Sequence, residues 1–330
     1  MRIGVVIPTF DKFATAELFA RMCREIEELG YDSAWFGDHV VMPQSAPDYM
    51  DPDWLDAVTC AINGMGRTTR LVFGTDVLVA PYRDPRLLAK MAASAVRLGG
   101  PRLQLGLGIG WMEDEFQVMG CPPFSDRTSV TEEYIEVMRL LFESEGPTEY
   151  NGKWIRFEGA IFEPRPESTL PILMGGNHAK ALRRAALLAD GWHPLFMKEG
   201  EYASARAEIE RIRQAEQISR PFIFSYSAPQ GKVTDSPPEA PAFGDKGAEG
   251  SSYAPPWPVD KLGRARFTGT AEQWRQDCDA FAQAGVEPQR ESLGLQGPLD
   301  SPLLVVEQVR RKRGHVPLGP RRGREAEPRR

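Results

Sequence analysis

Strand-like and helix-like segments alternate along most of this chain of 330 residues. A short apolar run such as residues 3–7 predicts a strand, and apolar residues at helical spacing in residues 16–29 predict the helix that follows it. This alternation favours parallel strands joined by helical crossovers. It predicts strands at residues 3–7, 33–36, 71–73, 103–107, 170–174, 191–193, 222–226 and 292–296, and helices at 16–29, 55–65, 85–98, 132–142, 179–189, 201–218 and 271–284. Eight strands in one alternating series favour an α/β fold of the closed (β/α)8 TIM-barrel type, with insertion loops, over an open sheet.

One barrel domain is expected to span residues 1–309, since barrels of this type commonly use about 250 residues or more for a single domain. Residues 310–330 form a basic tail rich in arginine, which we expect to be disordered. Two segments interrupt the alternation. Residues 148–162 predict a short excursion before the fifth strand, and the Pro/Gly/Ala-rich residues 236–258 predict a loop that serves as a mobile lid.

The bulk composition excludes several classes of protein. A net charge of −6 argues against a general nucleic-acid surface. The four cysteines are scattered without a CxxC pair, so neither a disulfide framework nor a structural zinc site is predicted. No apolar segment has the length of a membrane span or of a signal-peptide core. We therefore expect a cytoplasmic protein that acts on a small molecule, without nucleic-acid or membrane partners, and the sequence leaves a homodimer open.

The second predicted strand ends in Trp35-Phe36-Gly37-Asp38-His39, where an apolar run gives way to a carboxylate and an imidazole. In a barrel the strand ends hold the chemistry, and an imidazole is readily poised for proton exchange near neutral pH. Asp38 and His39 are therefore candidate catalytic residues. No HxH pair or HExxH helix accompanies them, so we predict hydrogen-bonding or surface roles for His178 and His193, and no metal site.

Glycine-rich segments follow two further strands. Gly106, Gly108 and Gly110 lead into Trp111, which stands where a dinucleotide-binding motif would need its third glycine, so a Rossmann fold is set aside. Trp111 and Glu113 either line the site or are structural. The run Gly175-Gly176-Asn177 precedes a predicted helix; it either closes a tight turn or binds a phosphate, and the usual place of phosphate sites in barrels favours the second.

The motifs together resemble the bacterial-luciferase-like family of flavin and deazaflavin oxidoreductases, in particular the branch that uses the deazaflavin coenzyme F-420. The similarity covers about residues 1–300. It is carried by Ile7-Pro8, GYDSAWFGDHVVMP (residues 30–43), LVFGTDVLVAPYRDPRLLAK (71–90), LQLGLGIGWMEDEF (103–116), LPILMGGNHAKALRRAA (170–186) and DGWHP (190–194).

This resemblance implies a barrel that holds the tricyclic cofactor ring at the carboxyl ends of the strands. His39 would lie near the reactive ring carbon, and a bulge with a non-proline cis peptide between Asp76 and Val77 would support the ring. Some deazaflavin-dependent members carry an acid where this chain has Trp111, so Glu113 is a substitute candidate for a catalytic acid. The cofactor-binding residues implied are Ile7, Pro8, Asp38, His39, Thr75, Asp76, Val77, Gly108, Gly110, Trp111, and, for the phosphate, Gly175, Gly176 and Asn177.

The sequence thus predicts an oxidoreductase in which coenzyme F-420 exchanges a hydride with a small organic substrate, with His39 as the proton-transfer partner. One alternative is an FMN-dependent luciferase-like monooxygenase that uses reduced flavin and oxygen. Another is a flavin-binding protein without catalysis. A barrel aldolase or isomerase is disfavoured, because a Schiff-base aldolase needs a lysine at a strand end and no predicted strand end has one.

Overall fold

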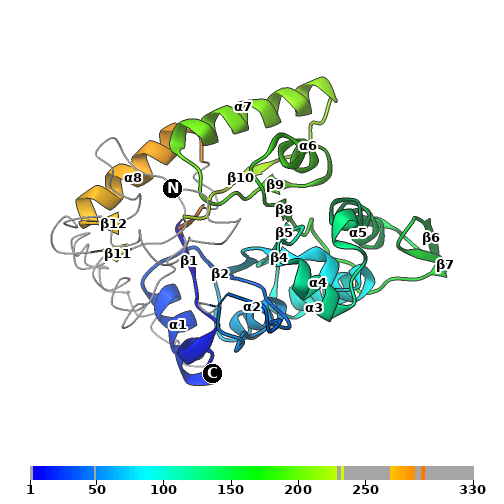
Figure 1. Ribbon diagram of the computed structural model, residues 1–330, viewed down its shortest axis with the longest axis horizontal. Helices are drawn as coiled ribbons and strands as arrows, with labels where there is room; N and C mark the ends of the chain where they lie inside the picture. Colours follow the sequence, from blue (N-terminus) through cyan, green and yellow to red (C-terminus); the bar gives the residue numbers. More distant parts are fainter. Residues whose placement is uncertain (1–2, 48–49, 229–231, 234–267, 287–290, 294–330) are drawn as a thin grey trace, which may run out of the picture.

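A single curled parallel sheet forms the centre of the computed structural model, which describes residues 3–47, 50–228, 232–233, 268–286 and 291–293 (Figure 1). The strand order is β10-β9-β8-β5-β3-β2-β1-β13, and β4 also pairs with β5. The bounds are β1 (Ile3–Val6), β2 (Ser33–Phe36), β3 (Val72–Thr75), β4 (Leu78–Val79), β5 (Leu103–Gly108), β8 (Ile172–Met174), β9 (Gly191–Trp192), β10 (Ile223–Phe224) and β13 (Glu291–Leu293).

The order of the strands follows the predicted alternation, but the closed barrel is not established. Within the described residues, the outermost strands β10 and β13 do not pair with each other, so the sheet is curled and open along this edge. The segment predicted as a third strand at residues 71–73 is also longer than expected. It consists of two pieces, β3 and β4, separated by Asp76 and Val77, and both pieces pair with β5.

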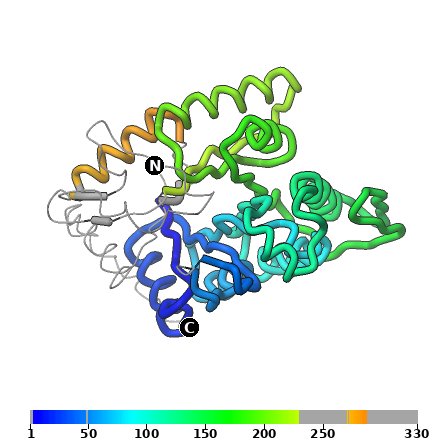
Figure 2. Tube along the Cα trace, viewed as in Figure 1, coloured from blue at the N-terminus to red at the C-terminus, as the bar shows by residue number. Residues whose placement is uncertain are grey.

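Helices lie outside the sheet, and most of them pack on their neighbours: α2 on α3, α3 on α5, α5 on α6, α6 on α7, and α7 on α8 (Figures 1 and 2). Local sequence defines several helix starts, as in α1, where the Thr15 side chain accepts a hydrogen bond from the backbone N–H of Leu18. The bounds are α1 (Ala16–Glu28), α2 (Ala57–Met65), α3 (Pro85–Gly99), α4 (Glu113–Met119), α5 (Arg127–Glu143), α6 (Ala179–Leu188), α7 (Glu199–Ala215) and α8 (Ala271–Gln283).

Three helices differ from the sequence prediction, and one of them, α7, ends at Ala215, three residues before the predicted end at 218. The short helix α4 was not expected, and α5 begins at Arg127, five residues before the predicted start at 132. Short 3-10 helices also occur in three connections, at η1 (Asp11–Phe13), η2 (Ala80–Tyr82) and η3 (Phe124–Asp126).

The excursion predicted at residues 148–162 is an antiparallel hairpin of β6 (Thr148–Asn151) and β7 (Arg156–Ala160), which projects away from the sheet (Figure 1). A separate parallel pair joins β11 (Lys232–Val233) and β12 (Thr268–Gly269). The predicted lid at residues 236–258 and the basic tail at 310–330 lie outside the described residues. Among the helices that are described, none is both long and apolar enough to cross a lipid bilayer.

The inner face of the sheet is filled by Trp35, which is fully buried with Val6 and Leu173. Glycines on the flanking strands make room for this indole: a Cβ atom on Gly74 would lie 2.3 Å from Trp35 Cε3, and one on Gly4 would lie 2.9 Å from Trp35 Nε1. The outer face packs against the helices in a large apolar core. Because Trp35 occupies the interior, we look for the site at the carboxyl ends of the strands.

Candidate active site

His39 lies directly after β2 and is joined to a buried carboxylate. Its Nδ1 atom is 2.8 Å from Oε2 of Glu115, on α4. The same carboxylate accepts hydrogen bonds from the backbone N–H of Val40 (2.9 Å) and from the Tyr82 hydroxyl (2.9 Å). The Glu115 side chain is fully buried, whereas 11% of the His39 side chain is exposed. A carboxylate can only accept this hydrogen bond, so Nδ1 of His39 carries the proton that it donates. Nε2 is then the ring nitrogen that remains to exchange a proton.

The hydrogen bonds keep Glu115 ionised. Burial raises the pKa of this carboxyl, but the hydrogen bonds from His39, Val40 and Tyr82 together hold its pKa below the ordinary value. Burial and the neighbouring Glu115 charge raise the pKa of Tyr82, so its hydroxyl remains a donor. The group therefore consists of an anion with three donors around it.

Two indoles surround the His39 ring. Trp54, in the loop before α2, meets His39 edge-on with ring centres 4.9 Å apart, and Trp111, after β5, does so at 6.2 Å. Phe10 stacks on Trp54 at 4.5 Å. Within the described residues, the buried atoms Trp54 Nε1 and Thr9 Oγ1 have no hydrogen-bond partner. The rings next to His39 are therefore largely apolar, and Trp54 carries one N–H without a partner among the described residues.

Asp38 is an anchor in the structure, although the sequence indicated a catalytic role. Its carboxylate pairs in bidentate fashion with Arg83, at 2.8 and 2.7 Å, and accepts a hydrogen bond from the Val79 N–H. Arg83 also pairs with Asp56. Burial lowers the pKa of Arg83, but its two carboxylate partners raise it more, so the cation persists. Because both oxygens of Asp38 are occupied, this carboxylate joins the end of β2 to β4 and is not free for proton transfer.

The Asp76–Val77 peptide is cis, which confirms the prediction for the strand-three bulge. Thr75 Oγ1 donates to the Gly106 carbonyl on β5 at 2.7 Å. Val77 occupies space that a side chain on β5 would need, because a Cβ on Gly108 would lie 2.6 Å from Val77 Cγ2. The glycines of β5 thus accommodate the bulge at the mouth of the sheet.

Below the bulge, Asp76 takes part in a second carboxylate–imidazole pair. Its Oδ1 is 3.0 Å from His193 Nε2, and its Oδ2 accepts from the Ser227 hydroxyl at 2.8 Å. His193 Nδ1 is 2.6 Å from Ser225 Oγ, and its ring stacks on Trp35 with centres 4.6 Å apart. The side chains of Asp76 and His193 are fully buried. His193 therefore has the hydrogen-bonding role expected from sequence.

The loop predicted to bind phosphate is a glycine turn that leads into α6. Gly176 has a φ of +99°, and α6 begins shortly after it. The Gly176 carbonyl accepts from Trp192 Nε1 (2.9 Å), and the Asn177 side chain donates to the Leu195 carbonyl (2.7 Å). A Cβ on Gly175 would have only ordinary contacts, with His193 O and Val77 Cγ1 at 3.5 Å and Leu107 O at 3.6 Å. This loop therefore lies next to the bulge.

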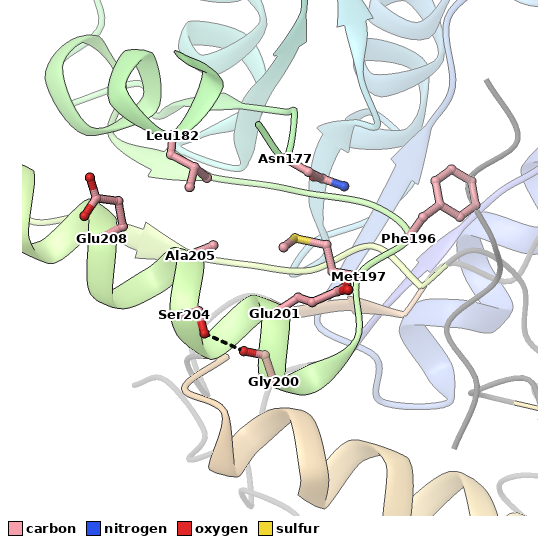
Figure 3. A pocket seen from close by; sticks show the side chains of 9 residues that line it. All are labelled: Asn177, Leu182, Phe196, Met197, Gly200, Glu201, Ser204, Ala205 and Glu208. Atoms are coloured by element: carbon pink, nitrogen blue, oxygen red, sulfur yellow. Dashed lines mark hydrogen bonds between the residues drawn. The ribbon is translucent and has the colours of Figure 1, made fainter. Parts of the chain in front are cut away.

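A groove of about 610 Å³ opens between α6 and α7, beginning at Asn177 (Figure 3). Figure 3 shows Leu182 and Asn177 on one side, the α7 residues on the other side, Met197 between them, and Phe196 at one end. The α7 residues that line it are Gly200, Glu201, Ser204, Ala205 and Glu208. The groove begins in the loop that the sequence predicts to bind phosphate.

Ile7 and Pro8 are buried at the end of β1, where the Ile7 N–H donates to the Trp35 carbonyl. Gly110 has a φ of +79° and leads to the partly buried Trp111. Glu113 is exposed in the first turn of α4, so the acid that reaches His39 is Glu115, two residues further on. The described residues contain no cluster of three or more potential metal ligands.

Glu115, Tyr82, Arg83 and Trp54 were missed by sequence reasoning. A pattern for Glu115 was nonetheless present: Met112, Glu115, Phe116 and Met119 have the spacing of one helix face, and the first three are buried. An acid on the apolar face of a short helix indicates a buried partner. Tyr82 ends the short 3-10 helix η2 and Trp54 lies in the loop before α2, and neither segment is long enough for a periodicity that marks inward side chains.

Comparison with known proteins adds the family. The model of the luciferase-like monooxygenase family matches residues 1–229, more than half of the chain. The chain belongs to this family. The resemblance expected from its motifs is thereby confirmed.

The luciferase-like relatives include an uncharacterized protein of Mycobacterium tuberculosis (strain ATCC 25618 / H37Rv), 32% identical over 228 residues that cover 65% of this chain and 77% of the relative. An F420-dependent glucose-6-phosphate dehydrogenase of Nakamurella multipartita is 29% identical over 192 residues, 55% of this chain and 52% of the enzyme. The matched part therefore spans about half of that dehydrogenase.

Solved luciferase-like structures share the fold. An F420-dependent secondary alcohol dehydrogenase, in complex with an F420-acetone adduct, has a TM-score of 0.74 at 17% identity, covering 94% of this chain and 97% of that one. A monooxygenase from Streptomyces bottropensis has the same score and identity, covering 94% and 98%. A riboflavin lyase with modified FMN has a TM-score of 0.70 at 15% identity, covering 95% and 92%. At these identities the likeness concerns the fold alone.

Proposed function

We propose that this protein is an oxidoreductase in which coenzyme F-420 exchanges a hydride with a small organic substrate. The observation that carries the proposal is the His39–Glu115 pair at the end of β2, a partly exposed imidazole held by a buried carboxylate. A positioned imidazole of this kind suits a reaction in which a proton and a hydride move separately. The names of two similar proteins, an F420-dependent glucose-6-phosphate dehydrogenase and an F420-dependent secondary alcohol dehydrogenase, support this choice of cofactor.

The described residues fit such a cofactor. Gly108 and Gly175 add no side chains of their own next to Val77, so Val77 is the side chain that a flat ring would meet there. Gly176 and the start of α6 offer backbone N–H groups for a phosphate. The deazaflavin supplies the hydride chemistry when it is bound.

The side chains around the mouth then have distinct tasks. Glu115 fixes the His39 ring by its contact with Nδ1, and Nε2 of His39 gives or takes the proton. Trp54 and Trp111 limit the access of water to this nitrogen. The unpaired Trp54 Nε1 offers a hydrogen bond to an oxygen of the substrate.

Parallel fluorescence titrations with F-420 and with FMN test the proposal, together with Gly176→Val. We expect F-420 to bind more tightly than FMN and the variant to bind at least tenfold more weakly, since a hydrogen bond to a charged group is worth about 1.5–3 kcal/mol. Gly30→Val is the matched control, because Gly30 has a similar φ of +86° with no atom near its Cβ position. Equal affinity of wild type and Gly176→Val would refute the phosphate assignment.

An FMN-dependent monooxygenase is the second candidate, and Trp111 favours it. By the family resemblance, Trp111 stands where some deazaflavin-dependent members have an acid. Tighter binding of FMN than of F-420, with oxygen consumption by the reduced complex, would select this candidate. Tight binding without turnover of any alcohol, ketone or aldehyde would instead indicate a flavin-binding protein without catalysis.

We further propose that the sheet closes into a full barrel through the β10 and β13 edges. The support is the parallel order of the strands, which runs as eight predicted segments from one edge to the other, with β3 and β4 counted together. A crystal structure with main-chain hydrogen bonds between these edges would establish closure.

A further inference from the structure

The interior pair of Asp76 and His193 is not used by the chemistry proposed above. It joins strands that are not neighbours, since β5 and β8 lie between β3 and β9 in the sheet. The contact from Asp76 to His193 spans 117 residues of sequence, and the contact to Ser227 spans 151. These bonds therefore cross the interior of the curled sheet.

The hydrogen bonds of this pair have a definite direction. Both oxygens of the Asp76 carboxylate are acceptors, so His193 Nε2 and the Ser227 hydroxyl must donate. His193 Nδ1 meets Ser225 Oγ at 2.6 Å, and the Tyr202 hydroxyl donates to the Ser225 carbonyl at 3.1 Å. Each polar atom of Asp76 and His193 thus has a partner, which is the condition for burying such groups without a large penalty.

The position of the pair connects it with the mouth. Below, the His193 ring lies on Trp35, the residue that fills the interior. Above, Asp76 is followed at once by Val77, which lies against the Cβ positions of Gly108 and Gly175. A layer of hydrogen bonds therefore lies between the apolar interior and the residue that faces the expected ring.

We propose that His193 is a positioning residue: it holds the Asp76 carboxylate, with Ser225 and Ser227, and thereby fixes Val77 against the cofactor ring. The cofactor in this statement rests on the proposed function. The geometric part stands on the described contacts alone. The pair is fully buried, so it does not contact the substrate. It acts by holding the backbone and the Val77 side chain in place.

Two variants distinguish the hydrogen bonds of the Asp76–His193 pair from the negative charge of Asp76. Asp76→Asn keeps an acceptor for His193 and a donor for the Ser227 oxygen, but it removes the charge. His193→Phe keeps a ring on Trp35 and removes both nitrogen contacts. Thr131→Val is the control for losing a buried hydrogen bond, because Thr131 is fully buried on α5 and bonds only to the Arg127 carbonyl among the described contacts.

The first measurement needs no cofactor. Hydrogen exchange of peptides that cover residues 73–79 should be at least tenfold faster in His193→Phe, near wild type in Asp76→Asn, and unchanged in Thr131→Val. Wild-type exchange in a folded His193→Phe protein overturns the proposal, whether or not any cofactor binds.

The second measurement uses F-420 and FMN as probes. We expect His193→Phe to bind the cofactor at least tenfold more weakly and with a smaller shift of its absorption band, and Asp76→Asn to bind within threefold of wild type. If Asp76→Asn loses as much affinity as His193→Phe, charge and not shape is the property that matters, and the proposal is wrong. Failure of wild type to bind either cofactor refutes the proposed function, while the exchange measurement still decides the role of His193.

Should His193→Phe not fold, Ser225→Ala and Ser227→Ala remove one partner each at smaller cost. Faster exchange over residues 73–79 in both supports the proposal. Exchange at the wild-type rate in both overturns it.

Discussion

Two carboxylate–imidazole pairs lie at different depths in this molecule. His39 and Glu115 lie at the mouth, where 11% of the His39 side chain is exposed, while His193 and Asp76 are both fully buried. In the outer pair the carboxylate contacts Nδ1 of the imidazole, and among the described residues Nε2 has no such anchor; in the inner pair both nitrogens are engaged. The same two functional groups can thus serve proton exchange in one place and shape in another, depending on whether one nitrogen is left over.

The largest expected effect is on the outer pair. His39→Ala should lower turnover by roughly 100-fold or more, the usual scale for loss of a positioned acid or base, with little change in cofactor affinity. The turnover is measured as reduction or reoxidation of the bound cofactor by a panel of alcohols, ketones and aldehydes. Wild-type turnover in this variant would mean that the His39–Glu115 pair, like the His193–Asp76 pair, has a structural role and does not transfer a proton.

Glu115→Gln should have a smaller effect of the same kind. The amide keeps the shape but loses the charge that fixes Nδ1, so turnover should fall roughly tenfold, in line with about 1.5–3 kcal/mol for a hydrogen bond to a charged group. Asp76→Asn is the matching change in the inner pair. Equal losses of turnover in the two variants would remove the distinction between the pairs.

Acidification should reduce the contribution of Glu115 to stability. The pKa of this carboxyl lies below its ordinary value of 4.5 in the folded protein, so its stabilisation is complete above that value and is lost as pH falls through the folded pKa. Urea unfolding of wild type and Glu115→Gln should differ by about 1–3 kcal/mol at pH 6 and converge toward pH 3. A difference that widens on acidification would contradict this assignment.

The smallest effect is expected at Glu113, the substitute candidate for the acid that some deazaflavin-dependent members carry at the position of Trp111. It is exposed in the first turn of α4, so Glu113→Gln should change stability by less than about 0.5 kcal/mol and turnover by less than about twofold. A tenfold loss of turnover would restore Glu113 as a proton donor and weaken the case for Glu115.

Periodic segments could be predicted well and the contacts between them could not. Residues 33–36 were predicted as a strand with the bounds of β2, because an apolar run between a turn and a glycine leaves little choice. Residues 113–119 were not predicted as a helix, since three acids at its start hide the buried face that includes Glu115. The inner pair joins residues 117 positions apart, and no local pattern encodes such a contact. The bulge at Asp76 was reached only through family resemblance.

Arg83 has a consequence for binding thermodynamics. It pairs with Asp38 at one end and Asp56 at the other end of the segment that carries His39 and Trp54. The residues at both ends of this segment are therefore fixed, and the entropy of ordering them is lost during folding rather than when a ligand arrives. A preorganised segment binds its ligand with a smaller entropic penalty. Loosening either end should therefore appear in calorimetry as a less favourable binding entropy, even though Arg83 touches neither indole nor imidazole among the described contacts.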